Sequence, residues 1–222
     1  MRKLTCEFIG TFALVFAGTG AIIINEAFGG VITHVGIALT FGLIILAMIY
    51  AVGDVSGAHL NPAVTLAFFA GRGFPGREVI PYICSQIAGA FTASAILKIL
   101  FPASATLGST LPAGSDAQSF LIEVILSFIL MFVILSVSTG AKEKGITAGI
   151  AIGAVIGLEA LFAGPVSGAS MNPARSLAPA ILSGHLNTLW IYLTAPVIGA
   201  LLAVPVCICT RGAECCGVTV SE

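Results

Sequence analysis

Two Asn-Pro-Ala triplets are the residues of this sequence best suited to chemistry. They are Asn61-Pro62-Ala63 and Asn172-Pro173-Ala174. Asn followed by Pro is a helix-start signal, because the Asn oxygen accepts from free N–H groups of the first turn and Pro has no N–H to leave unpaired. The side-chain NH₂ of each Asn is then expected to stay free to donate to a solute oxygen. The chemistry on offer is binding of a neutral, hydrogen-bonding solute, with simple helix capping as the alternative.

The helices that begin at these triplets are expected to be short. The first should cover Pro62–Ala70, before Gly71, and the second Pro173–Leu182, before Ser183. At about 1.5 Å per residue, each covers roughly half of a ~30 Å hydrocarbon core. Inside a membrane, each half-span therefore needs a partner half-span.

The composition indicates a membrane protein. Of the 222 residues, 58% are hydrophobic and 9% are charged, against roughly 25% charged residues in a soluble domain. Apolar runs near twenty residues predict six transmembrane helices. They cover Leu4–Ile24, Val31–Val52, Val79–Leu100, Gln118–Ser138, Ile146–Phe162 and Leu186–Cys209. The net charge of −1, with nine Lys and Arg scattered along the chain, argues against nucleic acid and leaves the lipid bilayer as a partner.

The positive charges predict the orientation of the chain in the membrane. If the six spans alternate, most Lys and Arg residues lie on the side of the N-terminus. These are Arg2, Lys3, Arg72, Arg77, Lys142, Lys144 and Arg211, and the exceptions are Lys98 and Arg175. Both termini are therefore expected to be cytoplasmic, in a multi-pass protein of the cell membrane.

The chain also consists of two similar halves. The stretch that begins at Glu7 resembles the one that begins at Glu123, 116 positions later, and Asn61 and Asn172 are 111 positions apart. A single channel domain is therefore predicted over residues 1–222, with a first repeat over 1–115 and a second over 116–222. Three spans per repeat is an odd number, so the second copy enters the membrane from the opposite side, as in channels and transporters.

An inverted repeat brings the two half-helices in from opposite faces, so that their N-termini meet near the midplane. Each N-terminus carries a partial positive charge of about half an elementary charge, and two of them at one place oppose cations. A water that accepts from both Asn turns its oxygen toward them, which interrupts the chain of donors that a proton would need.

The two triplets and the residues directly before them, in a six-span inverted repeat, resemble the aquaporin and aquaglyceroporin (major intrinsic protein) family. The preceding residues are Ser56-Gly57-Ala58-His59-Leu60 and Gly168-Ala169-Ser170-Met171. The resemblance covers nearly the whole chain, and Met48–Gly53 and Ala163–Met171 are most similar to the nodulin-26-like branch and its bacterial relatives. It implies an all-α membrane protein of six transmembrane helices plus two re-entrant half-helices, assembled as a homotetramer.

The resemblance also implies an outer constriction, the aromatic/arginine filter. Its four positions match Phe41, Ala160, Ala169 and Arg175. A charge inside the membrane costs about 3 kcal/mol or more without partners, so Arg175 is expected to meet pore water and carbonyls of the Gly164–Ala169 loop. Ala160 stands where water-specific members have His, so a wider opening is expected. Phe41 is alternatively a core aromatic, since the chain has fourteen Phe.

Supporting roles are implied for three more side chains. Glu7 and Glu123 match paired carboxylates that accept from backbone N–H groups of the two re-entrant loops. His59 matches a loop histidine that lines the cytoplasmic half of the pore, with a hydrogen bond inside the loop as the alternative. For Glu159, next to Ala160, the sequence leaves two roles open, a hydrogen bond to the outer loop and a protonated buried carboxyl.

The six Cys are predicted to be mostly plain thiols. Four crowd the C-terminal end on the reducing side of the membrane, where disulfides are not expected. The six are Cys6, Cys84, Cys207, Cys209, Cys215 and Cys216. The C-terminal spacing is not a zinc pattern, and binding of a thiophilic metal or metalloid and palmitoylation remain alternatives. No metal site and no cofactor is predicted.

Together these features predict a passive channel for water and small uncharged solutes that excludes ions and protons. The solutes are glycerol-like polyols, with urea and neutral metalloid acids as further candidates. No nucleophile–base set or phosphate loop supports an enzyme. A water-selective aquaporin is the first alternative. A secondary transporter, which would use the same inverted repeat, and a structural junction protein are the other classes.

Overall fold

The computed structural model describes residues 1–138, 142–212 and 215, without the side chains of residues 142–146. Over these residues the regular elements are eight α-helices and no strand, which confirms the all-α fold. They are α1 (Arg2–Ala27), α2 (Thr33–Ser56), α3 (Pro62–Ala70), α4 (Gly76–Leu100), α5 (Asp116–Ser138), α6 (Lys142–Ser167), α7 (Pro173–Ser183) and α8 (Leu189–Arg211).

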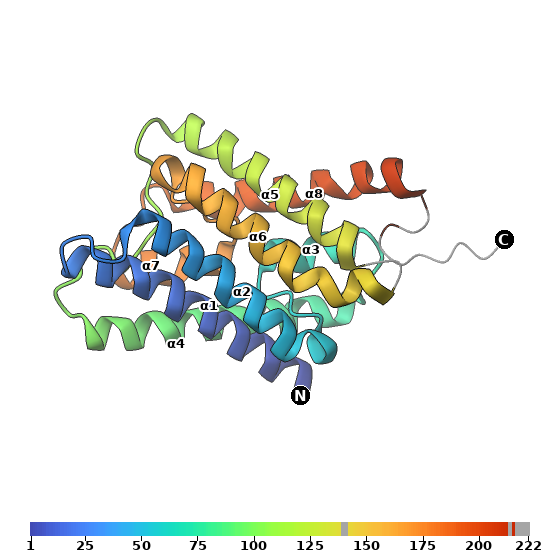
Figure 1. Cartoon of the computed structure of the whole chain (residues 1–222), viewed down its shortest axis with the longest axis horizontal. Helices are drawn as coiled ribbons and strands as arrows, with labels where there is room; N and C mark the ends of the chain where they lie inside the picture. Colours follow the sequence, from blue (N-terminus) through green and yellow to red (C-terminus); the bar gives the residue numbers. More distant parts are fainter. Residues whose placement is uncertain (139–141, 213–214, 216–222) are drawn as a thin grey trace.

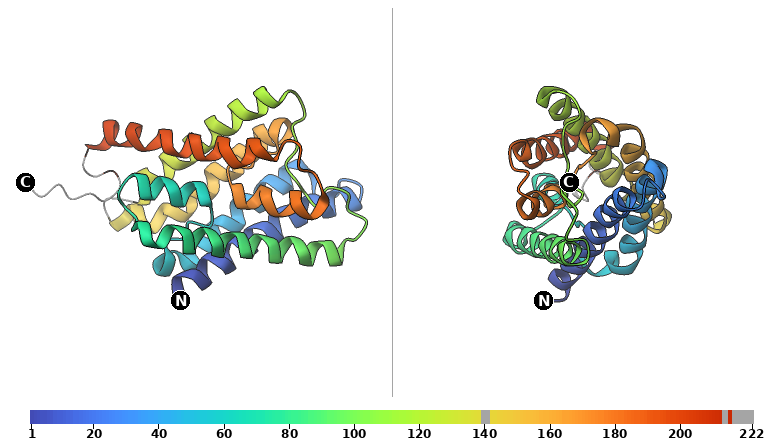
Figure 2. Two further views of the ribbon diagram at one scale, coloured as in Figure 1. Left: turned by 180° about the vertical axis from the view of Figure 1, so that it is seen from behind. Right: turned by 90° about the vertical axis from the view of Figure 1, so that its left-hand side faces the viewer.

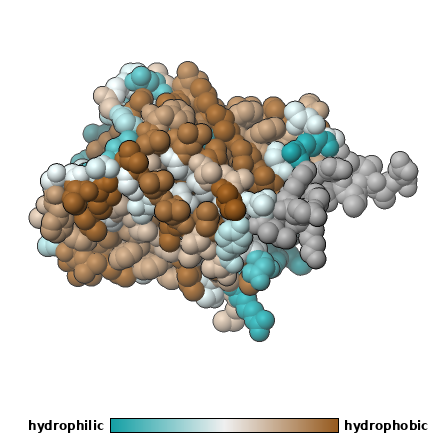
Figure 3. All heavy atoms as spheres, in the orientation of Figure 1, coloured by the Kyte–Doolittle hydropathy of each residue, from teal (hydrophilic) through white to brown (hydrophobic). Residues whose placement is uncertain are grey.

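Within the described ranges, six helices are long and apolar enough to cross a membrane: α1, α2, α4, α5, α6 and α8. The six predicted spans are therefore confirmed. A helix pairs its backbone groups internally, which is required where no water reaches them. Figure 3 shows hydrophobic side chains over most of the visible face, with hydrophilic residues mainly toward its ends.

Helix α6 continues beyond its predicted end at Phe162 and reaches Ser167, passing through Pro165. Pro165 has no N–H to donate to the carbonyl of Leu161, one turn earlier. The ring nitrogen Nε2 of His34 donates to this oxygen instead, at 2.7 Å. This replacement bond, from the first turn of α2, allows the helix to carry the proline.

The two short helices lie between α4 and α8, in opposite halves of the length of the bundle (Figures 1 and 2). Helix α3 contacts α4 and α8, and α7 contacts the same two helices. Among the long helices, α1 packs against α4, α5 packs against α8, and α2 packs against α6. The start of α1 and the end of α8 lie at the same end of the bundle (Figure 1).

Close backbone contacts hold the long helices together at equivalent places in the two halves. A β-carbon at Gly89 in α4 would overlap the carbonyl oxygen of Phe8 in α1. One at Gly199 in α8 would overlap the carbonyl oxygen of Val124 in α5. Small residues at such crossings let membrane helices approach closely enough for dispersion contacts to hold them.

Candidate functional site

Helices α3 and α7 begin at the prolines of the two triplets, and the preceding Asn caps each of them. Asn61 Oδ1 accepts from the N–H of Ala63 at 2.9 Å. Asn172 Oδ1 accepts from those of Ala174 at 3.0 Å and Arg175 at 3.4 Å. Both Asn have an extended backbone, which suits an N-cap. The predicted helix starts are confirmed.

The side-chain NH₂ groups of the two Asn join the two loops. Asn61 Nδ2 donates to the carbonyl of Met171 at 2.7 Å, and Asn172 Nδ2 donates to that of Leu60 at 2.9 Å. The expectation that these NH₂ groups are free is therefore wrong for one hydrogen of each. Because an amide NH₂ has two hydrogens, the second remains to meet a solute. The bonds also hold the N-termini of α3 and α7 together.

The loops that lead into α3 and α7 share an unusual backbone conformation. Positive φ angles occur at Gly57, Ala58 and Leu60 in the first loop and at Gly168, Ala169 and Met171 in the second. Non-glycine residues in this region are strained by about 1–3 kcal/mol each and persist where surrounding contacts impose the conformation, often at binding sites. Its recurrence in both loops indicates that both must aim their backbone groups in the same way.

Two buried carboxylates anchor these loops. Glu7 accepts from the N–H groups of His59 and Leu60 at 3.0 and 2.7 Å, and Glu123 accepts from those of Ser170 and Met171 at 2.8 and 2.9 Å. Neither Glu side chain is exposed. The contacts implied by the resemblance are present, and they connect α1 to the first loop and α5 to the second.

Two tyrosines that the sequence analysis did not single out hold the start of each loop. Tyr82 OH donates to the carbonyl of Ser56 at 2.9 Å, and Tyr192 OH donates to that of Ser167 at 2.7 Å. Both rings are buried. The signal for them is their separation of 110 positions, which is close to the 111 positions between the two Asn.

His59 both makes a local hydrogen bond and lines the cavity, the two roles considered from the sequence. Its Nδ1 lies 3.1 Å from Thr65 Oγ1, its ring stacks on Phe68 with centroids 4.8 Å apart, and it lines the cavity described below. Gln86 was also missed, although it donates to the same Thr65 hydroxyl at 3.0 Å and to the Glu7 carboxylate at 2.8 Å. No repeat signal reveals it, because the equivalent position in the second half holds Pro.

A cavity of ≈ 660 Å³ brings the predicted site residues together. Its wall includes both capping Asn and His59, and it extends to Tyr50 and Asp54 near the end of α2. All four positions implied for the filter also line it: Phe41, Ala160, Ala169 and Arg175. Two of these four contribute only a methyl group to the wall.

Arg175 is buried, with 2% of its surface exposed, and its partner differs from the expected one. Its Nη1 donates to the carbonyl of Gly108 at 2.9 Å, in the segment between α4 and α5. The prediction that carbonyls of the Gly164–Ala169 loop would be the partners is therefore wrong. The sequence alone does not show that the segment between α4 and α5 folds back to Arg175. Nε has no hydrogen-bond partner among the described residues. A guanidinium has five donors, so others remain for a solute in the cavity.

The ring of Phe41 lies beside Arg175. The Arg175 guanidinium carbon is 5.1 Å from the centroid of the ring, a distance typical of a cation–π contact. Phe41 packs in the main hydrophobic cluster and also lines the cavity. The two roles considered from the sequence, core aromatic and wall residue, therefore apply together.

Glu159 is a buried acid whose role the sequence left open. It is 1% exposed, and neither carboxylate oxygen has a hydrogen-bond partner among the described residues. A hydrogen bond to the described part of the outer loop, one of the two options, is therefore absent. Its neighbour Ala160 lines the cavity, whereas Glu159 is not part of the cavity wall.

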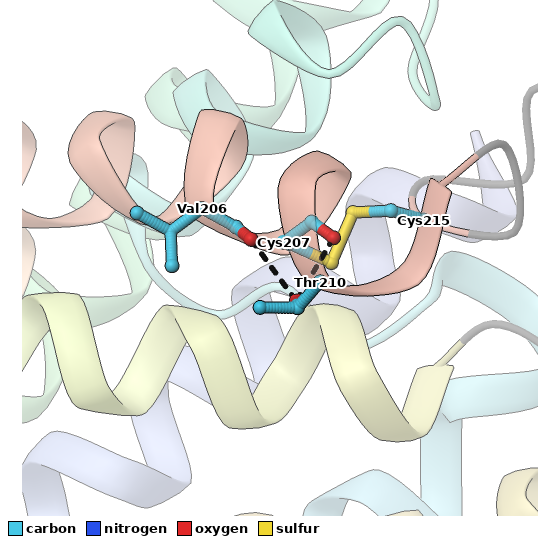
Figure 4. Close-up of a disulfide and its surroundings, with 4 residues drawn as sticks. All are labelled: Val206, Cys207, Thr210 and Cys215. Carbon is cyan, nitrogen blue, oxygen red and sulfur yellow. Dashed lines mark hydrogen bonds between the residues drawn. A yellow bond between two sulfur atoms is a disulfide. The ribbon is translucent and has the colours of Figure 1, made fainter.

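Cys207 and Cys215 form a disulfide, which corrects the expectation of plain thiols at the C-terminal end (Figure 4). Helix α8 ends at Arg211, and Gly212 with φ 61 turns the chain, so that the two Cα atoms lie 5.9 Å apart. Both Cys side chains are buried, and Thr210 Oγ1 donates nearby to the carbonyls of Val206 and Cys207. A further C-terminal cysteine, at position 216, lies outside the described residues.

Six membrane-crossing helices together with two Asn-capped half-helices, as seen in the described part of the chain, define a membrane channel with a cavity along its half-helices. Within the described residues, the cavity wall carries the side-chain hydrogen-bond donors of Asn61, Asn172 and Arg175 among mostly apolar residues. The chain belongs to the major intrinsic protein family, whose family model matches residues 1–206. It is thus a multi-pass channel for water and small solutes, not an enzyme.

Similar proteins agree with this assignment and with the resemblance stated from the sequence. Aquaporin NIP1-1 of Oryza sativa subsp. japonica is 49% identical, over 90% of this chain and 71% of its own length. Nodulin-26 of Glycine max is 45% identical, over 90% of this chain and 74% of its own. The solved aquaglyceroporin from Plasmodium falciparum has a TM-score of 0.83 and 25% identity, covering 92% of this chain and 93% of that one.

Proposed function

We propose that the channel conducts small uncharged solutes, with glycerol-like polyols first, together with water, and that it excludes ions and protons. Urea and neutral metalloid acids are further candidate solutes. The observation that carries the proposal is that Ala160 and Ala169 each contribute only a methyl group to the wall of the cavity that Phe41 and Arg175 also line. A water-selective aquaporin is the alternative that the experiment below separates from it.

At the filter, the cavity wall has an apolar surface and a hydrogen-bonding surface. The Phe41 ring and the two methyl groups form an apolar surface for the carbon backbone of a polyol. The Arg175 guanidinium lies beside the Phe41 ring, and its terminal N–H groups that Gly108 does not use are available for the hydroxyl oxygens. A site with one apolar side and one hydrogen-bonding side suits a small molecule that has both kinds of surface.

Deeper in the cavity, Asn61 and Asn172 each retain one amide hydrogen for a passing oxygen. The N-termini of α3 and α7 meet there, and their partial positive charges raise the energy of a cation. A water that accepts from both amides is oriented by them and does not continue a chain of donors across the centre. These two effects support exclusion of cations and protons.

The joined half-helices support a passive pore over a secondary transporter. Each loop is bonded to the other half-helix and to a buried Glu, so an alternating-access motion would have to break several buried hydrogen bonds at once. Among the described residues of the cavity wall, the Asp, Glu, Lys and Arg side chains are those of Asp54 and Arg175. Two such side chains are too few for a relay of ion-coupling sites.

The remaining parts of the proposal concern organisation. We assign residues 1–115 and 116–222 to two inverted repeats of one channel domain. Support comes from the equivalent anchors Glu7 and Glu123 and the equivalent tyrosines Tyr82 and Tyr192. We also propose that the protein lies in the cell membrane with both termini in the cytoplasm, an orientation that the positive charges support. Assembly as a homotetramer is proposed from family membership.

Stopped-flow light scattering on proteoliposomes tests the proposed solutes. Vesicles that contain the protein and empty vesicles are mixed in parallel with glycerol, urea, a neutral metalloid acid or an impermeant osmolyte. We expect faster water flux and faster glycerol entry than in empty vesicles, without dependence on a proton gradient. Fast water flux with glycerol, urea and metalloid acid entry at the empty-vesicle rate would instead make the chain a water-selective aquaporin.

A further inference from the structure

Gly18 of α1 provides the space that the Phe41 ring occupies. A β-carbon built at Gly18 would overlap the ring atoms Cε1, Cζ and Cδ1 of Phe41, the last at 2.6 Å. Carbon atoms in ordinary contact lie about 3.5–4.0 Å apart. The ring therefore rests directly on the backbone of α1, in a place that any larger residue at position 18 would fill.

Helix α2, which carries Phe41, is also held in close contact with α6, at the residue next to Phe41. A β-carbon at Gly42, the next residue, would lie 2.6 Å from the carbonyl oxygen of Gly153 in α6. The backbones of α2 and α6 are thus already in contact at this level. Backbone atoms yield at much higher cost than the end of a side chain, so a methyl group at position 18 would turn the ring rather than move the helix.

The cavity gives a displaced ring space to enter. Phe41 lines the cavity and faces Arg175, with the guanidinium carbon 5.1 Å from the ring centroid. A ring turned away from Gly18 therefore moves toward Arg175 and into the space beside Ala160 and Ala169. This is the space that the proposed function gives to the carbon backbone of a polyol.

We propose that Gly18 is a specificity-determining residue, which acts by positioning Phe41: its missing side chain holds the ring back from the pore and so sets the width of the filter. The inference rests on the proposed function, because it takes the Phe41 level as the place where solutes are selected. Gly18 touches no solute itself. Its identity nevertheless decides whether a molecule wider than water passes.

The test compares the glycerol-to-water permeability ratio of proteoliposomes with matched amounts of variant protein. Gly18→Ala should lower this ratio at least several-fold. The control is Gly20→Ala on the same helix, where the new β-carbon would meet Leu97 at an ordinary 3.4 Å and should leave the ratio unchanged. In a Phe41→Ala background, adding Gly18→Ala should no longer change the ratio, because no ring remains to be displaced.

An unchanged ratio in Gly18→Ala would overturn the inference, and so would an equal fall in the Phe41→Ala background, since that would be a general packing effect. If Gly18→Ala alone does not insert, the Gly18→Ala/Phe41→Ala double variant should insert and match Phe41→Ala. Failure of the double variant as well would also overturn it. If the wild type passes no glycerol, the proposed function fails, but the inference about Gly18 can still be tested on water permeability. Gly18→Ala should then lower water permeability in the presence of Phe41 and leave it unchanged in the Phe41→Ala background.

Discussion

Asn61 donates to the carbonyl of Met171 at 2.7 Å, so the cap of one half-helix is hydrogen-bonded to the residue that precedes the cap of the other. The reciprocal bond runs from Asn172 to Leu60 at 2.9 Å. The two positively polarised helix ends are therefore fixed against each other by two side chains. Each side chain caps its own helix, lines the cavity and retains one amide hydrogen that the bond between the loops does not use.

Replacing Asn61 with Asp should impair exclusion of cations or protons. Asp keeps the oxygen that accepts from Ala63, so α3 should still begin at Pro62. It cannot donate to Met171, and its negative charge offsets the helix-end potential. We expect proteoliposomes with this variant to dissipate a pH or potassium gradient faster than wild-type ones, as measured with a pH- or potential-sensitive dye. Normal insertion together with unchanged ion exclusion would count against the role given to the helix ends.

Replacing Glu123 with Gln should destabilise the second loop. The carboxylate accepts from Ser170 and Met171 with its two oxygens, and an amide offers an NH₂ in place of one of them. A buried N–H left without an acceptor costs about 1–3 kcal/mol, so the melting temperature in detergent should fall clearly. Glu7→Gln in the first half is the matched variant and should behave alike. Unchanged melting of both variants would mean that the carboxylates do not hold the loops.

Replacing Glu159 with Met should raise stability without closing the pore. A buried carboxyl without partners among the described residues costs about 1–3 kcal/mol, and Met fills a similar volume without polar atoms. We expect a higher melting temperature and unchanged water and glycerol permeability. A loss of permeability in a folded Glu159→Met variant would show that this carboxyl acts on the solute path, contrary to its position outside the cavity wall.

The local parts of this architecture follow from the sequence, whereas the contacts between distant segments do not. Asn-Pro sequences place the starts of α3 and α7, because the cap and the missing proline N–H are local effects. The end of α6 was predicted too early, since the bond that compensates for Pro165 comes from His34 in another helix. The bond from Arg175 to the carbonyl of Gly108 was not predicted for a similar reason. Gly108 lies in a loop distant in sequence, and no repeat or motif relates that loop to Arg175.

The repeat carries more information than the motifs alone. It relates Glu7 to Glu123 and, if applied more widely, would have revealed Tyr82 and Tyr192. The repeat gives no information where the halves differ. Gln86 could not be found in this way, because it has no counterpart in the second half. The disulfide between Cys207 and Cys215 depends on a turn after α8, which neither composition nor cellular compartment predicts.

Mercurial reagents should not block the wild-type pore directly. The free cysteines of the described chain are Cys6, Cys84 and Cys209, and the cavity wall contains none of them. Ala169→Cys puts a thiol on that wall and should make water flux mercury-sensitive and recoverable with a reducing thiol. Rapid, thiol-reversible block of the wild type that persists after replacement of the four C-terminal cysteines would place Cys6 or Cys84 in the pore and contradict the helix orientations.

The glycerol permeability of Ala160→His, measured beside the wild type in the same stopped-flow experiment, decides whether the methyl groups of Ala160 and Ala169 open the filter to solutes wider than water. An imidazole at position 160 narrows the space beside Phe41 and adds a polar group that favours water. We expect the wild type to pass glycerol, and we expect Ala160→His to lower glycerol permeability at least several-fold while water permeability changes little. Equal glycerol permeability in a folded Ala160→His channel, or none in the wild type, would show that these methyl groups do not set the width of the filter.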